Sequence, residues 1–393
     1  YYEQIITFYP HYIEAMNSLG AIYRRLGRYE ESIGILQRAV DEGRDAASVN
    51  YNLGFTYKEM GNFDDAIDAF NLVVNENPDD VLAYNHLGRI YHSQKKYDKA
   101  IASYKRGLQI DQNHPILNYN LAHVYEATKN VTDAIRCYQA ALKTRPGWVD
   151  AINDFSELLI KSQKNKEAQD LVQQSIKLHP TNADLLCLLG RIYLNQYDYS
   201  SAEKTFKQAD SYKANDVKIL TGLSEALEKG EKVDAALNTV LSALEIEPEN
   251  KDIRKQYVHT LLTAKDYDAA LANVKALYEE TEGKDLAVLD LYGQYYICKD
   301  QEEQAQQYYN KIQTQNHHYK DYMLGAASRF TQIGKLDKAE SYANEYIERR
   351  PSNPEGYNVL GKIFENKGDL HKAIDSYNKN LDLRRPNVLA DKK

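Results

Sequence analysis

Few residues in this sequence have the types and spacing that catalysis or metal binding requires. His317 and His318 are adjacent in a turn-like segment, where two imidazoles rarely converge on one metal ion, and no third ligand lies near them. Acidic pairs such as Asp79-Asp80 are typical of turns and helix starts rather than of paired catalytic carboxylates. We therefore predict no catalytic residue and no metal site.

Sequence motifs for known chemistry are missing as well. The chain has no Gly-rich phosphate loop, no His-Glu-x-x-His and no Gly-x-Ser-x-Gly. Asn130 begins an Asn-Val-Thr triplet, which is a glycosylation motif, but such triplets are common by chance. The sequence predicts a protein that is not an enzyme and that uses no cofactor.

Composition narrows the classes of partner. The 393 residues are 43% hydrophobic and 27% charged, which suits a soluble folded chain, and the formal net charge is −8. Phosphate binding needs a basic face, so we expect no nucleic acid as the main partner. No apolar run approaches the roughly 18 residues of a membrane span.

Most of the sequence repeats with a period of 34 residues. A residue type that recurs in each repeat indicates a structural position and not a single catalytic site. One residue is inserted near 283–285, after which the period resumes. Eleven units begin at Ile13, Ala47, Val81, Pro115, Val149, Ala183, Val217, Lys251, Leu286, Lys320 and Pro354.

The repeated positions predict two packed helices in each unit. In the unit that begins at Ala47, Gly54 and Tyr57 occupy positions 8 and 11, and Ala66 and Phe70 occupy positions 20 and 24. Spacings of three and four residues place such side chains on one helical face. Small residues at positions 8 and 20 let the two backbones approach, and large residues at positions 11 and 24 fill the space beside that contact.

Glycine and proline mark the ends of the helices. Gly61 lies between the two helices of its unit, where a helix C-terminus favours glycine. Pro78 lies at position 32, where it cannot continue the second helix.

This pattern resembles the tetratricopeptide repeat family over essentially the whole chain. The resemblance implies an all-α, right-handed superhelical solenoid of antiparallel helix pairs, with about eleven repeats and an N-terminal half repeat. It also implies that the first helices of the repeats line a concave groove.

The register divides the chain into four segments. We assign 1–12 to the second helix of a truncated repeat, 13–282 to repeats one to eight, 286–387 to repeats nine to eleven, and 388–393 to a tail. The inserted residue predicts either a hinge near 279–286 or a longer turn, and both alternatives stay open. Asn380 is polar at a position that is usually small or apolar, which predicts a last helix that faces water.

The three cysteines, Cys137, Cys187 and Cys298, lie in units that are not adjacent. Because a stacked array keeps such units apart, we expect free thiols and no disulfide. Free thiols slightly favour a cytoplasmic location, but the localisation stays undetermined.

The groove is where we expect a partner to bind. The resemblance implies that positions 2, 5, 6, 9, 12 and 13 of each first helix face it. Side-chain amides there offer a donor and an acceptor to the backbone of an extended peptide. Asn52 and Asn120 are similar to part of the asparagine ladder of O-linked N-acetylglucosamine transferases, although His86 interrupts the row. The predicted peptide-binding residues are Arg24, Tyr51, Asn52, Phe55, Asn85, Arg89, Tyr119, Asn120 and His123.

The charges of the groove favour one class of ligand. Arg24, Lys58 and Arg89 make the early repeats positive, which favours an acidic segment of a partner. The family's carboxylate clamp for chaperone tails is not assembled, since Lys255 is followed by His259 instead of the asparagine that the clamp needs.

We predict a non-catalytic scaffold that binds a protein or an extended peptide. One alternative is the substrate-docking region of a larger enzyme, such as a glycosyltransferase. Another is a homo-oligomer formed through the ends of the array, because an uncapped end exposes apolar surface.

Overall fold

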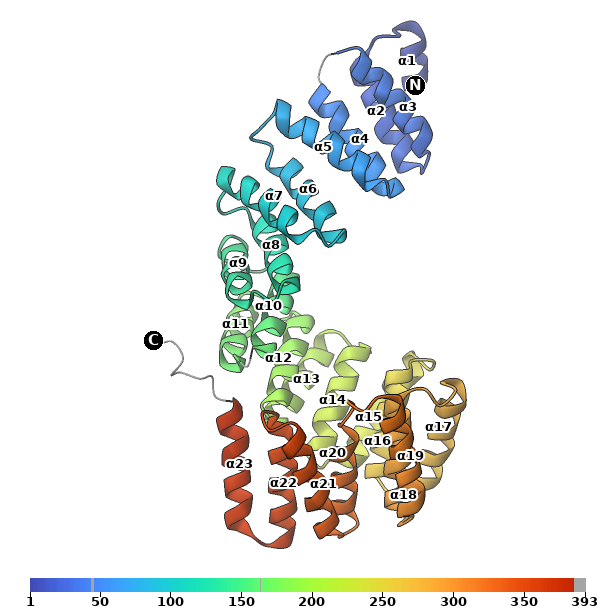
Figure 1. Ribbon diagram of the computed structural model, residues 1–393, viewed down its shortest axis with the longest axis vertical. Coiled ribbons are helices and arrows are strands. Elements are labelled where there is room, and N and C mark those ends of the chain that lie inside the picture. The colour runs from blue at the N-terminus through green and yellow to red at the C-terminus, as the bar shows by residue number, and fades with distance from the viewer. Residues whose placement is uncertain (44–45, 163, 385–393) are drawn as a thin grey trace. The chain divides into compact units, whose positions relative to one another are not determined.

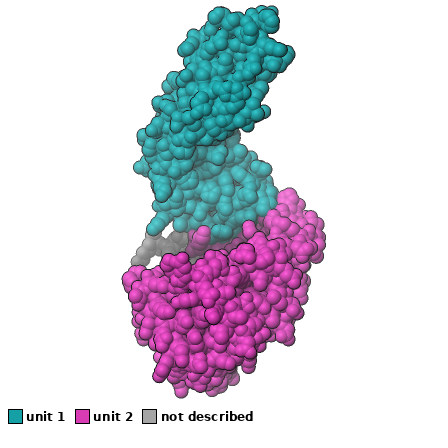
Figure 2. Space-filling view, turned by 90° about the vertical axis from the view of Figure 1, so that its right-hand side faces the viewer, with its two compact units in different colours: residues 1–158 teal, residues 159–393 magenta. Residues whose placement is uncertain are grey.

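The protein is built from α-helices joined by short turns (Figure 1). The computed structural model describes residues 1–43, 46–162 and 164–384, and no β-strand occurs in these ranges. The chain divides into two compact units, residues 1–158 and residues 159–393, which Figure 2 draws in different colours. We call them unit 1 and unit 2 and describe each by itself.

The first unit begins with a short helix and continues with longer ones of similar length. Its helices are α1 (Tyr2–Phe8), α2 (Ile13–Arg25), α3 (Tyr29–Asp41), α4 (Ala46–Met60), α5 (Phe63–Glu76), α6 (Val81–Ser93), α7 (Tyr97–Ile110), α8 (Pro115–Ala127), α9 (Val131–Thr144) and α10 (Val149–Lys161), in which the boundary with unit 2 falls.

The second unit continues the same alternation. Its helices are α11 (Asn165–Leu178), α12 (Ala183–Asn195), α13 (Tyr199–Tyr212), α14 (Val217–Lys229), α15 (Val233–Ile246), α16 (Lys251–Thr263), α17 (Tyr267–Glu280), α18 (Leu286–Cys298), α19 (Glu302–Gln315), α20 (Tyr322–Gln332), α21 (Leu336–Arg349), α22 (Pro354–Lys367) and α23 (Leu370–Arg384).

Helix pairs are the packing unit, as the period predicts. The first helix of a repeat packs most extensively on the second, as α4 does on α5 and α12 on α13. The second helix then packs on the first helix of the next repeat, so each repeat buries its apolar face against its neighbours. In both units the first helices of successive repeats also touch, for example α2 with α4 and α18 with α20. We call these first helices the inner helices.

Small residues at positions 8 and 20 bring the two backbones of a repeat together, as expected. The hydroxyl of Ser32, at position 20, donates to the carbonyl of Gly20, at position 8, over 2.8 Å. The ring at position 24 lies directly on the glycine rather than beside the contact. A Cβ atom on Gly54 would lie 2.8 Å from the ring of Phe70, so only glycine fits there.

Wherever position 15 of a repeat is described, the turn between its two helices has a left-handed residue there. Gly61 has φ +89°, and the same position is left-handed in Lys95 (φ +58°) and Lys129 (φ +60°). The left-handed region favours glycine, so a lysine in it carries some strain. The handedness of this turn is therefore common to repeats with and without the glycine.

The extra residue near 283–285 lies in the turn between α17 and α18. Glu282 and Gly283 both have positive φ there, at +52° and +63°. The ring of Tyr278 lies against Gly283, and the amide of Gln315 donates to the Gly283 carbonyl over 3.1 Å. The two helices that flank the turn pack on one another.

The prediction that Asn380 faces water is wrong. Asn380 is only 4% exposed, and its amide donates to the carbonyl of Pro354 over 2.6 Å. A buried amide is tolerated when it is hydrogen-bonded in this way. The water-facing side of α23 instead carries the apolar side chains of Leu370, Ile374 and Leu381. Self-assembly through this end remains a prediction.

The structure also bears on disulfides, metal sites and membrane-spanning helices. All three cysteines are free thiols, and burial raises the pKa of Cys137 and of Cys187 to about 11. No group of three or more His, Cys, Asp or Glu side chains could hold a metal ion in the described part of the chain. Within the same ranges, no helix combines the length and hydropathy needed to cross a bilayer.

Candidate functional site

Positions 5 and 6 of neighbouring inner helices meet in unit 1. The side-chain amide of Asn52, on α4, donates to Asn17 Oδ1, on α2, over 2.7 Å. Asn120, on α8, donates to Asn85 Oδ1, on α6, over 2.8 Å. Each pair is separated by 35 residues, one repeat and one position, because the helices stack in the same register. The asparagines therefore form two separate pairs.

Contacts made by tyrosines alternate with the amide pairs at the same two positions. The ring of Tyr51 meets the ring of His86 edge-on, with 5.7 Å between the ring centres. The hydroxyl of Tyr119 donates to Asp154 Oδ2 over 2.5 Å. Along the inner helices of unit 1 an amide pair thus alternates with a contact made by a tyrosine.

The amide pairs still have unused hydrogen-bonding atoms. Asn52 and Asn120 each donate one N–H, while their Oδ1 atoms accept no hydrogen bond from any described residue. Asn85 is only 6% exposed, so it belongs to the wall of the groove more than to its surface. Asn17, which sequence analysis did not select as a site residue, is the equivalent acceptor for Asn52. One carbonyl oxygen in each pair is left for a ligand.

Four rings form an aromatic cluster beside the first amide pair. His86 lies 4.6 Å from Phe55 and 5.2 Å from Phe70, between ring centres, and Tyr51 borders all three. Burial, and then the nearby Lys58, lowers the pKa of His86 to about 4. Burial raises the pKa of Tyr51 to about 12. The cluster is therefore uncharged near neutral pH.

Positive charge surrounds this aromatic cluster. Arg24 lies over the ring of Phe55 at 5.3 Å, but Glu59 pairs with its guanidinium at 2.5 Å. Lys58 lies over the same ring at 4.9 Å, and burial followed by repulsion from Arg89 lowers its pKa. In the described ranges neither Lys58 nor Arg89 has an ion-pair partner. No carboxylate of the described ranges therefore neutralises these two cations.

A small pocket brings three of the predicted residues together. It has a volume of about 220 Å³ and is lined by Arg89, Asn120 and His123 together with His92, Ser93 and Tyr104. The hydroxyl of Tyr104 is buried and lacks a hydrogen-bond partner in the described structure, and burial raises its pKa. Tyr104 occupies position 24 of its repeat, a packing position, so its unpaired hydroxyl could not be predicted from the sequence.

Carboxylates of the fourth and fifth repeats give the next part of the groove the opposite charge. His123 Nε2 lies 3.2 Å from Asp154, and its Nδ1 lies 3.8 Å from Glu126. Tyr119 packs on Trp148, with 4.5 Å between the ring centres. The positive part of the groove thus ends at the third repeat. Trp148 was missed because it follows α9 outside the inner-helix positions, although its being the single tryptophan was a usable signal.

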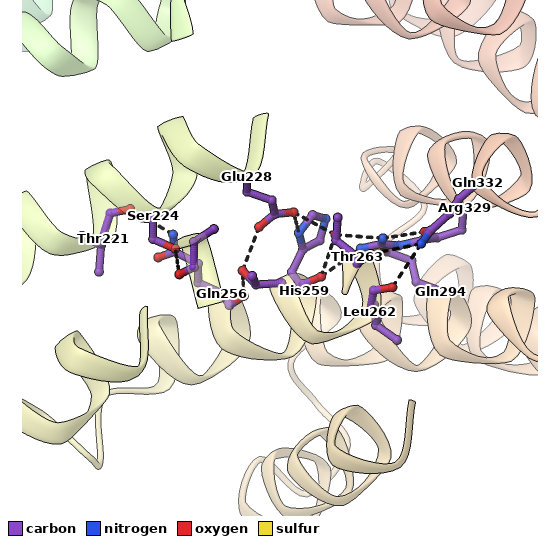
Figure 3. A network of polar contacts seen from close by, with 12 residues as sticks. Thr221, Ser224, Glu228, Gln256, His259, Leu262, Thr263, Gln294, Arg329 and Gln332 are labelled. Carbon is purple, nitrogen blue, oxygen red and sulfur yellow. Dashed lines mark hydrogen bonds and ion pairs between the residues drawn. The ribbon is translucent and has the colours of Figure 1, made fainter. Parts of the chain in front are cut away.

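The inner helices of unit 2 are connected differently, by a polar network that crosses α14, α16, α18 and α20 (Figure 3). Glu228 Oε1 lies 2.7 Å from His259 Nδ1, and its Oε2 accepts from the hydroxyl of Thr260 over 2.7 Å. Burial alone would raise the pKa of Glu228, but His259 and Thr260 hold it at about 2. The carboxylate is therefore ionised inside the fold.

Arg329 completes this network from α20. It is 4% exposed and donates to Gln294 Oε1, Thr263 Oγ1 and the His259 carbonyl, over 3.0–3.1 Å. Gln332, one turn further along, donates to the carbonyls of α16. These side chains bond side chains up to 66 residues away and backbone carbonyls up to 70 residues away in the sequence. None of the predicted peptide-binding residues lies in this unit.

Models of known families match the chain in several places. Models described as "Tetratricopeptide repeat" match residues 11–75, 69–102, 116–147, 159–227 and 324–387, and one described as "TPR repeat" matches residues 88–129. No sequence among the curated proteins matches the chain.

Solved structures with a similar fold have low sequence identity. Human IFIT1, solved as a dimer with m7Gppp-AAAA, is 15% identical, with a TM-score of 0.45 over 96% of this chain and 91% of that one. Yeast Tom70 is 13% identical, with a TM-score of 0.44 over 96% and 93%. YrrB, a TPR protein with an unusual peptide-binding site, is 19% identical, with a TM-score of 0.39 over 48% and 97%.

The period, the helix pairs and the family models agree from repeat to repeat. The 34-residue spacing appears in the structure as successive helix pairs, and the matched segments fall in both units. The chain is an all-α solenoid and belongs to the tetratricopeptide repeat family.

Proposed function

We propose that the protein is a non-catalytic scaffold whose unit 1 holds an extended peptide of a partner along α2, α4, α6 and α8. The repeats support a role in protein interaction. The observation that carries the finer proposal is the pocket lined by Arg89, Asn120 and His123. It lies where an amide with an unused carbonyl oxygen meets an unpaired guanidinium.

The unused amide oxygens suit the backbone of an extended chain. Asn52 Oδ1 and Asn120 Oδ1 can each accept a backbone N–H, and their second N–H groups can donate to a carbonyl. The asparagines lie on α4 and α8, with α6 between them. Two such anchors fix the direction of a peptide while remaining indifferent to its side chains.

The local charges favour an acidic segment at one end of the groove. Lys58 and Arg89 are the unneutralised cations near the aromatic cluster, whereas Asp154 and Glu126 lie beside His123. A peptide with acidic residues at one end and neutral or basic residues at the other complements this arrangement.

The experiment uses Trp148 as a built-in reporter, because it packs on Tyr119 at one end of the groove. Peptides of about twelve residues would be selected from a random library on the intact protein and titrated while tryptophan fluorescence is recorded. We expect an acidic consensus. We also expect Asn120→Ala and Arg89→Ala each to weaken binding about tenfold, since each removes a hydrogen bond to a charged or buried group.

The matched control is Arg106→Ala, which removes an equally exposed arginine from α7, outside the inner helices. It should bind the selected peptide like the wild type. Far-UV circular dichroism would confirm that each variant is folded. If peptides are selected but Arg89→Ala and Asn120→Ala bind them normally, the groove of unit 1 is not their site.

A further inference from the structure

Unit 2 contains a cavity that is lined by none of the predicted peptide-binding residues. Its volume is about 740 Å³, and its lining comes from the inner helices α12, α14 and α16 and from the last repeat, α22 and α23. Cavities of 300–1,000 Å³ are the usual size for small-molecule sites. The residues of this cavity are not used by the proposed function.

Three side chains close the cavity where the end of the chain returns to its middle. The hydroxyl of Tyr197, between α12 and α13, donates to the carboxylate of Glu355 on α22. The guanidinium of Arg384, at the end of α23, lies 3.5 Å from the centre of the Tyr197 ring and donates to the Asn195 carbonyl over 2.7 Å. Residues 158 to 189 positions apart in the sequence thus meet at one edge of the cavity.

The cavity has an excess of unpaired positive charge. Arg191, Lys218 and Lys229 line it, and among the described residues none of the three has an ion-pair partner. Glu225 is the one carboxylate of the lining without a hydrogen-bond or ion-pair partner in the described chain. The other two are engaged, since Asp252 pairs with Lys255 at 2.8 Å and Glu355 accepts from Tyr197. This local balance opposes the net charge of −8 of the chain.

Arg384 adds a donor that has no acceptor. Its Nε atom is buried, with no hydrogen-bond partner in the described structure, while its Nη1 atom is used by Asn195. Burial lowers its pKa. A buried donor that lacks an acceptor is costly, and an anion in the cavity would supply one.

The spacing of the lysines indicates the shape of the ligand. Lys218 and Lys229 lie eleven residues apart on α14, just over three full turns, so they share a face of the helix. At about 1.5 Å per residue, their Cα atoms are roughly 16 Å apart. A compact anion could contact only one of the two lysines, whereas an elongated anion could contact both.

We propose that this cavity binds a small, elongated polyanion, and that the contact of Arg384 with Tyr197 and Glu355 closes the cavity around it. The shared chemistry is a row of anionic groups, either phosphates or carboxylates. The proposal concerns unit 2 and does not depend on peptide binding in unit 1.

The test is isothermal titration calorimetry on the full chain at low ionic strength, with inorganic tripolyphosphate in one arm and a tetraglutamate peptide in the other. We expect at least one probe to bind with a stoichiometry of about one and to weaken as salt is added. The arm that binds more tightly identifies phosphate or carboxylate as the preferred group. If neither probe binds, the proposal fails.

The variants locate the binding. Lys218→Gln with Lys229→Gln should reduce the affinity at least tenfold, because it removes the two ends of the cationic row. The matched control, Lys143→Gln with Lys275→Gln, removes the same charge from exposed helix positions outside the cavity and should leave the affinity unchanged. An equal loss in both double variants would mean that the probe senses the overall charge, and the site would be wrong.

A second variant tests the closure. Arg384→Gln leaves the lysines in place but removes the cation that stacks on Tyr197, so we expect weaker binding and faster dissociation. Circular dichroism should show an unchanged helix content, because the packing along the array does not use this side chain. If Arg384→Gln binds the probe with unchanged affinity and dissociation rate, the closing role of the contact is refuted.

Discussion

The inner helices of the two units are connected in different ways and at different positions of the repeat. In unit 1, neighbouring inner helices meet through amide and aromatic pairs that leave polar atoms unused, such as Asn120 Oδ1. In unit 2, the inner helices α14 to α20 are joined by buried charged groups, with Glu228 and Arg329 at the two ends of the network. Polar residues of the inner helices can therefore either offer hydrogen bonds to a ligand or hold the array together.

The difference has an energetic consequence. A part-buried hydrogen bond between two neutral amides contributes little net free energy to folding, because the unfolded chain forms hydrogen bonds with water instead. A buried cation with several hydrogen bonds cannot be removed without leaving buried acceptors unsatisfied. Substitutions at inner-helix positions should therefore affect binding in unit 1 and stability in unit 2.

The largest effect is expected for Arg329→Ala. The change deprives Gln294, Thr263 and the His259 carbonyl of a buried donor, so we expect a loss of about 3 kcal/mol or more in the free energy of unfolding. Urea denaturation followed by circular dichroism measures this. Arg106→Ala, at an exposed site, is the control and should stay within about 0.5 kcal/mol of the wild type. A similar small effect for Arg329→Ala would remove the energetic distinction between the units.

A pH effect should follow from Asp290, which lies buried on α18 near Gln294, Arg329, Asp321 and Tyr309. Burial raises the pKa of its carboxyl to about 7, and its Oδ1 atom accepts no hydrogen bond in the described chain. The folded form therefore holds the proton more tightly than the unfolded form, whose pKa is about 4. This contribution to stability is complete below pH of about 4 and is lost as the pH rises through about 7.

We therefore expect Asp290→Asn to stabilise the protein at pH of about 8 by up to about 4 kcal/mol, since it removes the buried charge. Near pH of about 4 the variant and the wild type should be equally stable. Thermal or urea denaturation across this range measures both. A wild-type protein whose advantage over the variant grows with pH would contradict the assigned sign.

A smaller loss of stability is expected from substitutions at the glycine of position 8, whose close contact with the ring at position 24 occurs in both units. In Gly88→Ala the new Cβ atom would lie 2.5 Å from the ring of Tyr104, and in Gly293→Ala it would lie 2.3 Å from the ring of Tyr309. Overpacking of this kind costs about 1–3 kcal/mol, and the cost should be similar in the two units. Gly34→Ala is the matched control, because nothing lies within 4 Å of its Cβ position in α3. It should be neutral or stabilise the helix by up to about 1 kcal/mol.

The smallest effect on stability is expected for Asn120→Ala. It removes one part-buried hydrogen bond to Asn85, so the free energy of unfolding should fall by about 1 kcal/mol or less. The same variant is expected to lose peptide affinity. A destabilisation comparable to that of Arg329→Ala would mean that the amide pairs, too, are mainly structural.

The repeat could be predicted from the sequence because the same packing problem is solved in each unit. Glycine at position 8 and alanine at position 20 recur where the two backbones of a repeat approach, so their spacing predicted the helix pairs. The groove residues were harder to predict, because exposed positions are not constrained by packing. The rule that placed Asn52 and Asn120 on the inner helices also selected Asn85, which proves to be buried.

Asn380 shows where a local rule fails. Its polarity at a usually apolar position indicated that the side chain is exposed to water. In the fold the amide is buried and donates to the Pro354 carbonyl. Lys95 and Lys129 show a related limit, since nothing in a lysine predicts the left-handed backbone that the turn imposes on it. In both cases the surrounding packing outweighs the preference of the single residue.

The sequence by itself determined the family, the helix pairs and their order, because these follow from a local pattern that recurs every 34 residues. Only the tertiary structure decided which inner-helix side chains are hydrogen-bonded to neighbouring helices and which keep polar atoms available to a ligand. It also decided that Arg384 meets Tyr197 across 187 residues of chain. Such contacts depend on how small rotations between repeats add up, and no single repeat contains that information.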